Sequence, residues 1–162
     1  RPGELSGDHV ATIPVVAHAV NWLLQNGGDP GFVCCIYATA PLIQMNDLIE
    51  AYKLFQSNQW SFVFSATTFP FPIQRAFKKK DSGGIEMFQP NHFESRSQDL
   101  EEAYHDAGQF YFGKPEAWIN NERIFQNNSE IVVLPNWRVQ DIDTKDDWRS
   151  AEILMNHIHK GA

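Results

Sequence analysis

The sequence has only two cysteines, Cys34 and Cys35, and they are neighbours inside an apolar run. Adjacent side chains on a strand point to opposite faces, so a disulfide bond between these two is not expected. Without a disulfide framework, buried free thiols favour a reducing, cytoplasmic setting. The sequence also lacks an apolar run of the ~18 residues that a membrane-spanning helix needs, so no membrane partner is expected.

Positive charge is scarce as well. The chain carries 13 Lys and Arg against 20 Asp and Glu, a formal net charge of −7. This balance argues against nucleic acid as a partner, because a phosphate backbone requires clustered cations. The sequence contains no Gly-x-Ser-x-Gly, Cys-x-x-Cys or His-Glu-x-x-His motif, so neither a nucleophile-elbow hydrolase nor a zinc site of these types is indicated.

Helices and strands alternate in the first half of the chain. Pro14 and the apolar pairs that follow it predict a helix over 14–25. The continuous apolar run 32–37 predicts a strand covered on both faces. A helix capped by Asn46 or Asp47 and a buried strand at 61–67 follow. We therefore expect one α/β domain over 1–162, with three layers and a mostly parallel sheet.

The second half begins with an irregular excursion over 69–99. Its prolines and glycine pair predict a partly hairpin segment that acts as a lid or reaches a partner. A short helix is predicted over 97–103, strands over 108–112 and 130–134, and a final helix over 144–159. That last helix is expected to bury four apolar side chains: Trp148, Ala151, Leu154 and Ile158.

Two carboxylates, Asp141 and Asp143, directly precede the last helix. In an extended segment, residues i and i+2 project to the same side roughly 6–7 Å apart, so both can converge on one cation while Ile142 turns inward. Mg²⁺ is typically held by one or two carboxylates, waters and substrate phosphates, which makes this a candidate phosphate-handling metal site. Thr144 and Asp147 form a capping box that starts the helix. The alternative is a pair of solvated turn aspartates.

Four segments carry a family resemblance. They are Arg1-Pro2-x-Glu4-Leu5-x-x-Asp8, the run from Ile36 to Leu42, the run from Arg96 to Tyr111, and Asp141-Ile142-Asp143-Thr144-x-x-Asp147. In this order they resemble the cytidylyltransferases that activate nonulosonic acids, the CMP-sialic acid synthetase family. The third segment, the run 71–76 and the turn 37–41 are more similar to the pseudaminic acid branch than to the sialic acid branch.

The resemblance implies a fold of the nucleotide-diphospho-sugar transferase type and an enzyme that transfers CMP from CTP to pseudaminic acid, releasing pyrophosphate. It implies Mg²⁺ as cofactor, a link to flagellin glycosylation and a homodimer. Sialic or legionaminic acid is the alternative acceptor. Five phenylalanines in the excursion favour it as the dimer contact, the alternative being that they fold back onto their own sheet. They are Phe69, Phe71, Phe77, Phe88 and Phe93.

Site residues follow from the matched motifs. Asp141 and Asp143 match the catalytic metal-binding pair. The candidate nucleotide-binding residues are Arg1, Thr12 and Thr39. The candidate sugar-binding residues are Tyr37, Arg75, Arg96, His105, Gln109 and Tyr111. Their alternatives are a surface ion pair with Glu94 or Asp99 for Arg96, a structural role for His105, and plain core packing for Tyr111.

The family's N-terminal phosphate loop, of the type Ala-Arg-x-Gly-Ser-Lys, has no match here. The resemblance therefore implies the C-terminal portion of a longer enzyme. We expect this portion alone to be inactive, because residues 1–20 offer only Arg1 to a triphosphate that needs several donors. The alternative is a non-catalytic nucleotide-sugar-binding or dimerisation module.

Overall fold

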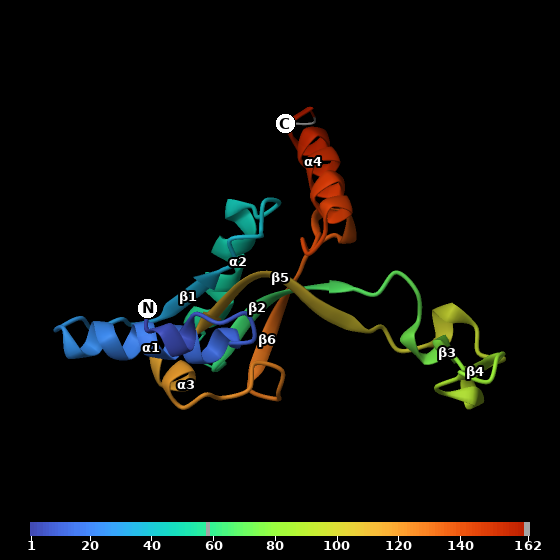
Figure 1. Cartoon of the computed structure of the whole chain (residues 1–162), viewed down its shortest axis with the longest axis horizontal. Coiled ribbons are helices and arrows are strands. Elements are labelled where there is room, and N and C mark those ends of the chain that lie inside the picture. The colour runs from blue at the N-terminus through green and yellow to red at the C-terminus, as the bar shows by residue number, and fades with distance from the viewer. Residues whose placement is uncertain (58, 161–162) are drawn as a thin grey trace.

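A mixed four-stranded sheet forms the centre of the protein (Figure 1). The computed structural model describes residues 1–57 and 59–160. The strands are β1 (Val33–Ile36), β2 (Phe62–Thr68), β5 (Tyr104–Gly113) and β6 (Ser129–Val133), in the order β1-β5-β2-β6. β5 runs antiparallel to both of its neighbours, and β6 runs parallel to β2. The expectation of a mostly parallel sheet is therefore wrong.

The reason is that β2 and β5 are the two sides of one long hairpin. Thr68 lies opposite Tyr104, and the Phe69 N–H donates to the Ala103 carbonyl at 3.0 Å just beyond them. Strands joined by helical crossovers run parallel, but a strand that returns without a crossover pairs antiparallel. The alternation of helices and strands showed the first kind of connection and could not reveal the second.

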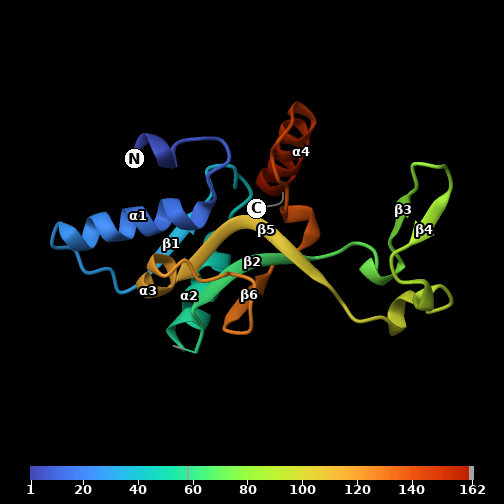
Figure 2. The ribbon, with the colours of Figure 1, turned by 60° about the horizontal axis from the view of Figure 1, so that its bottom comes forward.

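Helices cover both faces of the sheet, so the predicted three layers are present (Figure 2). The covering helices are α1 (Thr12–Gln25), α2 (Met45–Gln56) and α3 (Pro115–Ile119); the fourth helix is α4 (Lys145–Lys160). On one face, Phe55 of α2 packs in a cluster with Phe110 and Phe112. On the other face, α1 and α3 pack against β2, and Trp118 meets the Phe62 ring edge-on at 5.0 Å.

Most predicted elements are present, with two corrections. The helix expected over 97–103 is wrong: only a 3₁₀ turn forms, η4 (Ser97–Asp99), after which Leu100 is extended. Arg96 closes that turn by binding Asp99, and the chain then enters the hairpin pairing of β5. The short helix α3 was not predicted, because five residues are too few for a helical period.

Residues 69–103 form an arm at the tip of the β2–β5 hairpin, and the arm extends away from the sheet (Figures 1 and 2). It contains the small hairpin of β3 (Phe77–Lys79) and β4 (Ile85–Met87), and the 3₁₀ turns η2 (Ile73–Arg75) and η3 (Pro90–His92). Gly83 and Gly84 take the positive φ values of 88° and 82° that the hairpin turn requires. The partly hairpin excursion is thus as the sequence predicts.

The last helix, α4, also stands clear of the sheet (Figure 1). It follows the 3₁₀ turn η5 (Asn136–Arg138); a further such turn, η1 (Gly3–Leu5), begins the chain. Ala151 is buried, but Trp148 is 59% exposed, so the expectation that the helix buries this tryptophan is wrong. Among the described residues, no helix has both the length and the apolar character needed to cross a membrane.

Candidate functional site

A groove of about 540 Å³ lies between the turn after β1 and the stretch of α4 from Trp148 to Asn156. Thr39 and Pro41 line it from the turn, and Ile142 and Trp148 line it from the α4 side. Asp141 and Asp143 flank Ile142 in sequence, but of these three residues only Ile142 lines the groove, and both aspartates are exposed. The fold thus brings two of the predicted motifs to one place.

The aspartate pair lies in an exposed loop rather than on a strand, because β6 ends at Val133. One oxygen of Asp141 accepts the Ile142 N–H at 3.1 Å. Within residues 1–57 and 59–160, no protein group is bonded to the other Asp141 oxygen or to the Asp143 carboxylate. These free carboxylate oxygens fit Mg²⁺. Over the same residues no cluster of three or more His, Cys, Asp or Glu could hold a metal, so water and phosphate would supply the remaining ligands.

The predicted capping box is confirmed. The Thr144 N–H donates to Asp147 Oδ2 at 2.8 Å, and the Asp147 N–H donates to Thr144 Oγ1 at 3.2 Å. The Thr144 hydroxyl also donates to the same carboxylate at 2.7 Å, and the Asp143 N–H at 3.2 Å. These bonds, the hydroxyl bond above all, hold the pKa of the Asp147 carboxyl below its ordinary value. The box therefore fixes the loop to the start of α4.

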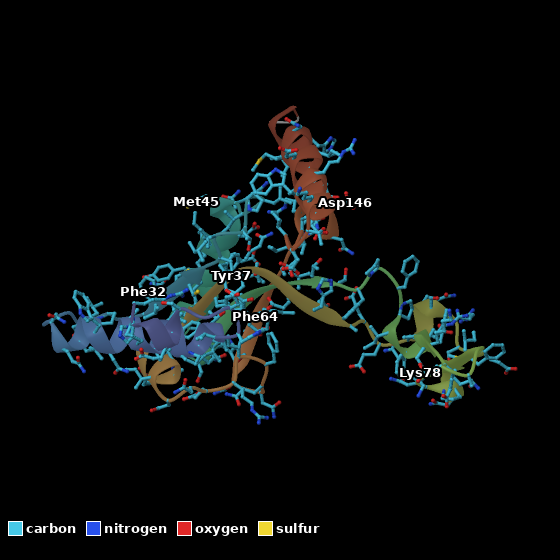
Figure 3. All side chains as sticks on the ribbon, viewed as in Figure 1. Phe32, Tyr37, Met45, Phe64, Lys78 and Asp146 are labelled. Atoms are coloured by element: carbon cyan, nitrogen blue, oxygen red, sulfur yellow. The ribbon has the colours of Figure 1, made fainter. Side chains whose placement is uncertain are left out.

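A second pocket, of about 450 Å³, gathers Thr12, Tyr37 and Tyr111 with an aspartate that the sequence analysis did not select, Asp106. The Thr12 and Tyr37 hydroxyls lie 2.6 Å apart, and the two tyrosine rings lie 5.2 Å apart. The Tyr111 hydroxyl donates to Asp106 at 2.5 Å. Burial, and then this bond, raise the pKa of Tyr111, so the phenol stays protonated. Figure 3 shows Tyr37 near the centre of the molecule, between α1 and the base of α4.

Two other predicted sugar-binding residues on β5 have different neighbours. Gln109 is 3% exposed, and its side-chain amide donates to the Arg138 carbonyl at 2.7 Å rather than facing the tyrosine pocket. His105 packs its ring edge-on against Phe69 at 4.8 Å, and its Nδ1 lies 2.9 Å from the Asp106 carbonyl oxygen. Strand alternation puts Gln109 beside Tyr111, but a register shift in the β2–β5 pairing intervenes.

The three predicted arginines lie apart from both pockets. Arg75 and Arg96 belong to the arm, and Arg1 is exposed at the start of the chain. Arg96 binds Asp99 through Nε at 2.7 Å and through a second nitrogen at 3.1 Å. That is the surface ion pair named as the alternative for this residue. Within one chain, Arg75 and Arg96 therefore lie away from the pocket of Thr12, Tyr37 and Tyr111, where the lining arginine is Arg123.

Comparison with known proteins identifies the family to which the chain belongs. No protein-family model matches it. It is 44% identical over 162 residues to the pseudaminic acid cytidylyltransferases of two Campylobacter jejuni strains, serotypes O:23/36 and O:2, covering 100% of this chain and 70% of each relative. The chain belongs to the pseudaminic acid cytidylyltransferase family. The resemblance read from the motifs is thereby confirmed.

Two more distant relatives also match the chain. A Helicobacter pylori protein, whose name joins pseudaminic acid cytidylyltransferase with a nucleotide-sugar hydrolase, is 34% identical over 143 residues, covering 88% of this chain and 27% of that protein. A Campylobacter coli protein named post-translational flagellin modification protein B is 24% identical over 165 residues, covering 96% of this chain and 66% of that protein.

Replacing Thr144 by Ala should raise the pKa of Asp147 towards its ordinary value, because the bond that lowers it most is lost. In the wild type, a lowered pKa means that these contacts stabilise the helix start above the unfolded-state pKa, and that this contribution is lost as the pH falls through the folded-state value. An NMR titration of the Asp147 carboxyl carbon measures both proteins. Ser150→Ala is the control, since its hydroxyl donates to the Asp146 carbonyl instead. An unchanged pKa in Thr144→Ala would contradict the assignment.

Proposed function

We propose that this chain carries the nucleotide- and sugar-binding machinery of an enzyme that transfers CMP from CTP to pseudaminic acid and releases pyrophosphate. The observation that carries the proposal is the 44% identity to two pseudaminic acid cytidylyltransferases across the whole chain. The groove where the turn of Thr39 meets the loop of Asp141 and Asp143 supports it. A mixed sheet covered by helices is in keeping with a nucleotide-diphospho-sugar transferase fold.

Asp141 and Asp143 would hold Mg²⁺ through their free carboxylate oxygens. When bound, Mg²⁺ neutralises phosphate charge as a Lewis acid, which a chain with a net charge of −7 otherwise offers little means to do. The protein's part would be to hold the two carboxylates on either side of Ile142, which lines the groove. Thr39, which lines the groove from the turn after β1, would contact the nucleotide.

The tyrosine pocket would bind the sugar. Thr12, Tyr37 and Tyr111 supply hydroxyl groups there, and Asp106 supplies an acceptor that already binds one of them. Stereoisomeric nonulosonic acids share the carboxylate and the anomeric centre, so a charge contact alone cannot separate them. Discrimination needs placed donors and acceptors that the wrong isomer leaves unpaired. This pocket has that composition.

The complete enzyme should prefer pseudaminic acid over N-acetylneuraminic acid by orders of magnitude in kcat/KM. Pyrophosphate release with CTP and each sugar, measured side by side, tests the proposal. Equal efficiency with N-acetylneuraminic acid would contradict the acceptor and leave the cytidylyltransferase activity standing. No turnover with either sugar would instead favour a non-catalytic nucleotide-sugar-binding module.

Asp143→Asn in the complete enzyme should lower kcat by orders of magnitude while the fold is kept, because the exposed side chain has no protein partner to lose among the described residues. Steady-state kinetics over a Mg²⁺ series and a circular dichroism spectrum provide the measurement. Asp146→Asn, at the second residue of α4, is the matched control. Near-normal Mg²⁺-dependent turnover in Asp143→Asn would refute the role.

The arm would form the contact of a homodimer. Its five phenylalanines are all exposed, from 41% for Phe69 to 80% for Phe71, although Phe69 also packs against His105 of β5. Exposed aromatic surface of this kind marks an interface. A second copy is the occupant that also explains the arginines, because the arm of one subunit could bring Arg75 and Arg96 to the sugar pocket of its partner.

Phe71→Asp with Phe93→Asp should convert the dimer into monomers, since two charges would have to be buried at the contact. Light scattering at micromolar concentration reads the mass directly. Ile153→Asp, on α4 and 63% exposed, is a control of similar exposure outside the arm. A wild-type protein that is strictly monomeric, or a dimer that survives both substitutions, would contradict the interface.

A further inference from the structure

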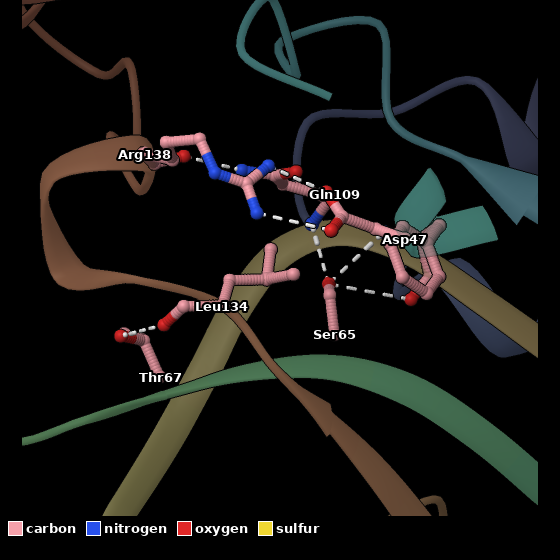
Figure 4. Close-up of polar contacts among 7 residues, drawn as sticks. Asp47, Ser65, Thr67, Gln109, Leu134 and Arg138 are labelled. Atoms are coloured by element: carbon pink, nitrogen blue, oxygen red, sulfur yellow. Dashed lines mark hydrogen bonds and ion pairs between the residues drawn. The ribbon is translucent and has the colours of Figure 1, made fainter. Parts of the chain in front are cut away.

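A buried ion pair joins two segments that lie far apart in the sequence (Figure 4). Arg138 Nη1 lies 2.5 Å from Asp47 Oδ2, and Nη2 lies 3.0 Å from Oδ1. Arg138 is 7% exposed and Asp47 is 8% exposed. The other ion pairs between described residues, Lys78–Glu86 and Arg96–Asp99, are both exposed. A buried bidentate ion pair fixes the orientation of the guanidinium group as well as its distance from the carboxylate.

The backbone of Arg138 is held separately from its side chain. Its carbonyl accepts the side-chain amide of Gln109 at 2.7 Å, and the Gln109 N–H in turn donates to Ser65 Oγ at 3.2 Å (Figure 4). The side chain of Arg138 is thus tied to α2 and its backbone to β5 and β2. Because its side chain and its backbone are bonded to different elements, Arg138 has little conformational freedom.

The restrained residue lies immediately before the aspartate loop. Only Val139, which packs against the core, and Gln140 separate Arg138 from Asp141. The Gln140 side-chain amide donates to the Asp141 carbonyl at 2.8 Å. At the other end, the capping box of Asp147 ties the loop only to α4, and α4 stands clear of the sheet (Figure 1). On the side of the loop that precedes Asp141, the hydrogen-bonded connection to α2 and β5 therefore runs through Arg138.

We propose that Asp47 and Arg138 are positioning residues for the metal site: their ion pair holds the loop so that Asp141 and Asp143 reach one cation. The inference rests on the metal role assigned above to the two aspartates. Replacing a buried ion pair by apolar residues is often neutral for the free energy of unfolding. Stability alone therefore does not explain why this pair is present, whereas the geometry that it imposes on the loop does. Groups that orient metal ligands commonly change metal affinity 10–100-fold when altered.

Binding of Mn²⁺ alone, as a stand-in for Mg²⁺, tests the proposal through the electron paramagnetic resonance signal of the free ion, with no turnover involved. Asp47→Asn should weaken Mn²⁺ binding by about 10-fold or more, because the isosteric amide leaves the guanidinium without its counter-charge. Arg138→Lys keeps the charge but loses the fork, and should weaken binding by a smaller factor. The control is Ala51→Gly, which destabilises the same helix from a fully buried position without touching the pair.

The outcomes separate the two assignments. Weaker binding in Asp47→Asn and Arg138→Lys, with Ala51→Gly within twofold of the wild type, supports positioning. Wild-type affinity in both pair variants, with Asp143→Asn impaired, overturns the positioning role and leaves the metal site intact. Wild-type affinity in Asp143→Asn as well would overturn both. If Asp47→Asn fails to fold, the comparison of Arg138→Lys with Ala51→Gly decides, because unfolding temperatures and Mn²⁺ affinities are measured on each.

Discussion

The antiparallel pairing of β5 with β1 and β2 is the interaction on which the rest of the molecule depends. It places Tyr111 opposite Cys35 on one side and opposite Phe64 on the other, so this strand carries both halves of the core. The pairing is irregular: between Phe64 and Ala66, β5 passes from Tyr111 to Asp106, and Gly108 there has a φ of 62°. Such a bulge re-aims side chains, and here it turns Asp106 towards the Tyr111 hydroxyl.

The same hairpin divides the protein into a body and an arm. The body supplies both pockets and the aspartate loop, whereas the arm supplies exposed aromatic rings and two of the predicted arginines. β2 and β5 pair up to Thr68 and Tyr104, with one register shift between Phe64 and Ala66, so the arm begins directly at the paired end of this hairpin. The antiparallel return of β5 after the arm therefore determines where the arginines and the exposed phenylalanines of the arm lie.

Buried polar groups explain why some candidate residues do not line a pocket. Gln109 has the right chemistry to bind a sugar, but a buried amide needs partners, and it finds one in the Arg138 carbonyl. Tyr111 has a hydrogen-bonding hydroxyl at a pocket wall and a ring in the core, so packing and binding are compatible there. Whether a residue of β5 lines a pocket or is buried depends on its position relative to the bulge. The residue type alone does not show that position.

Local signals in the sequence determined the elements and the family. Apolar periodicity located α1, α2 and α4, apolar runs located the strands, and Thr144 with Asp147 located the start of the last helix, because these features depend on neighbours within a few residues. Tertiary structure alone decided the direction of β5, the exposure of Trp148, the partner of Gln109 and the ion pair of Arg138 with Asp47. Those outcomes depend on contacts between residues far apart in the chain, and a single sequence records the residues of such contacts without recording which of them meet.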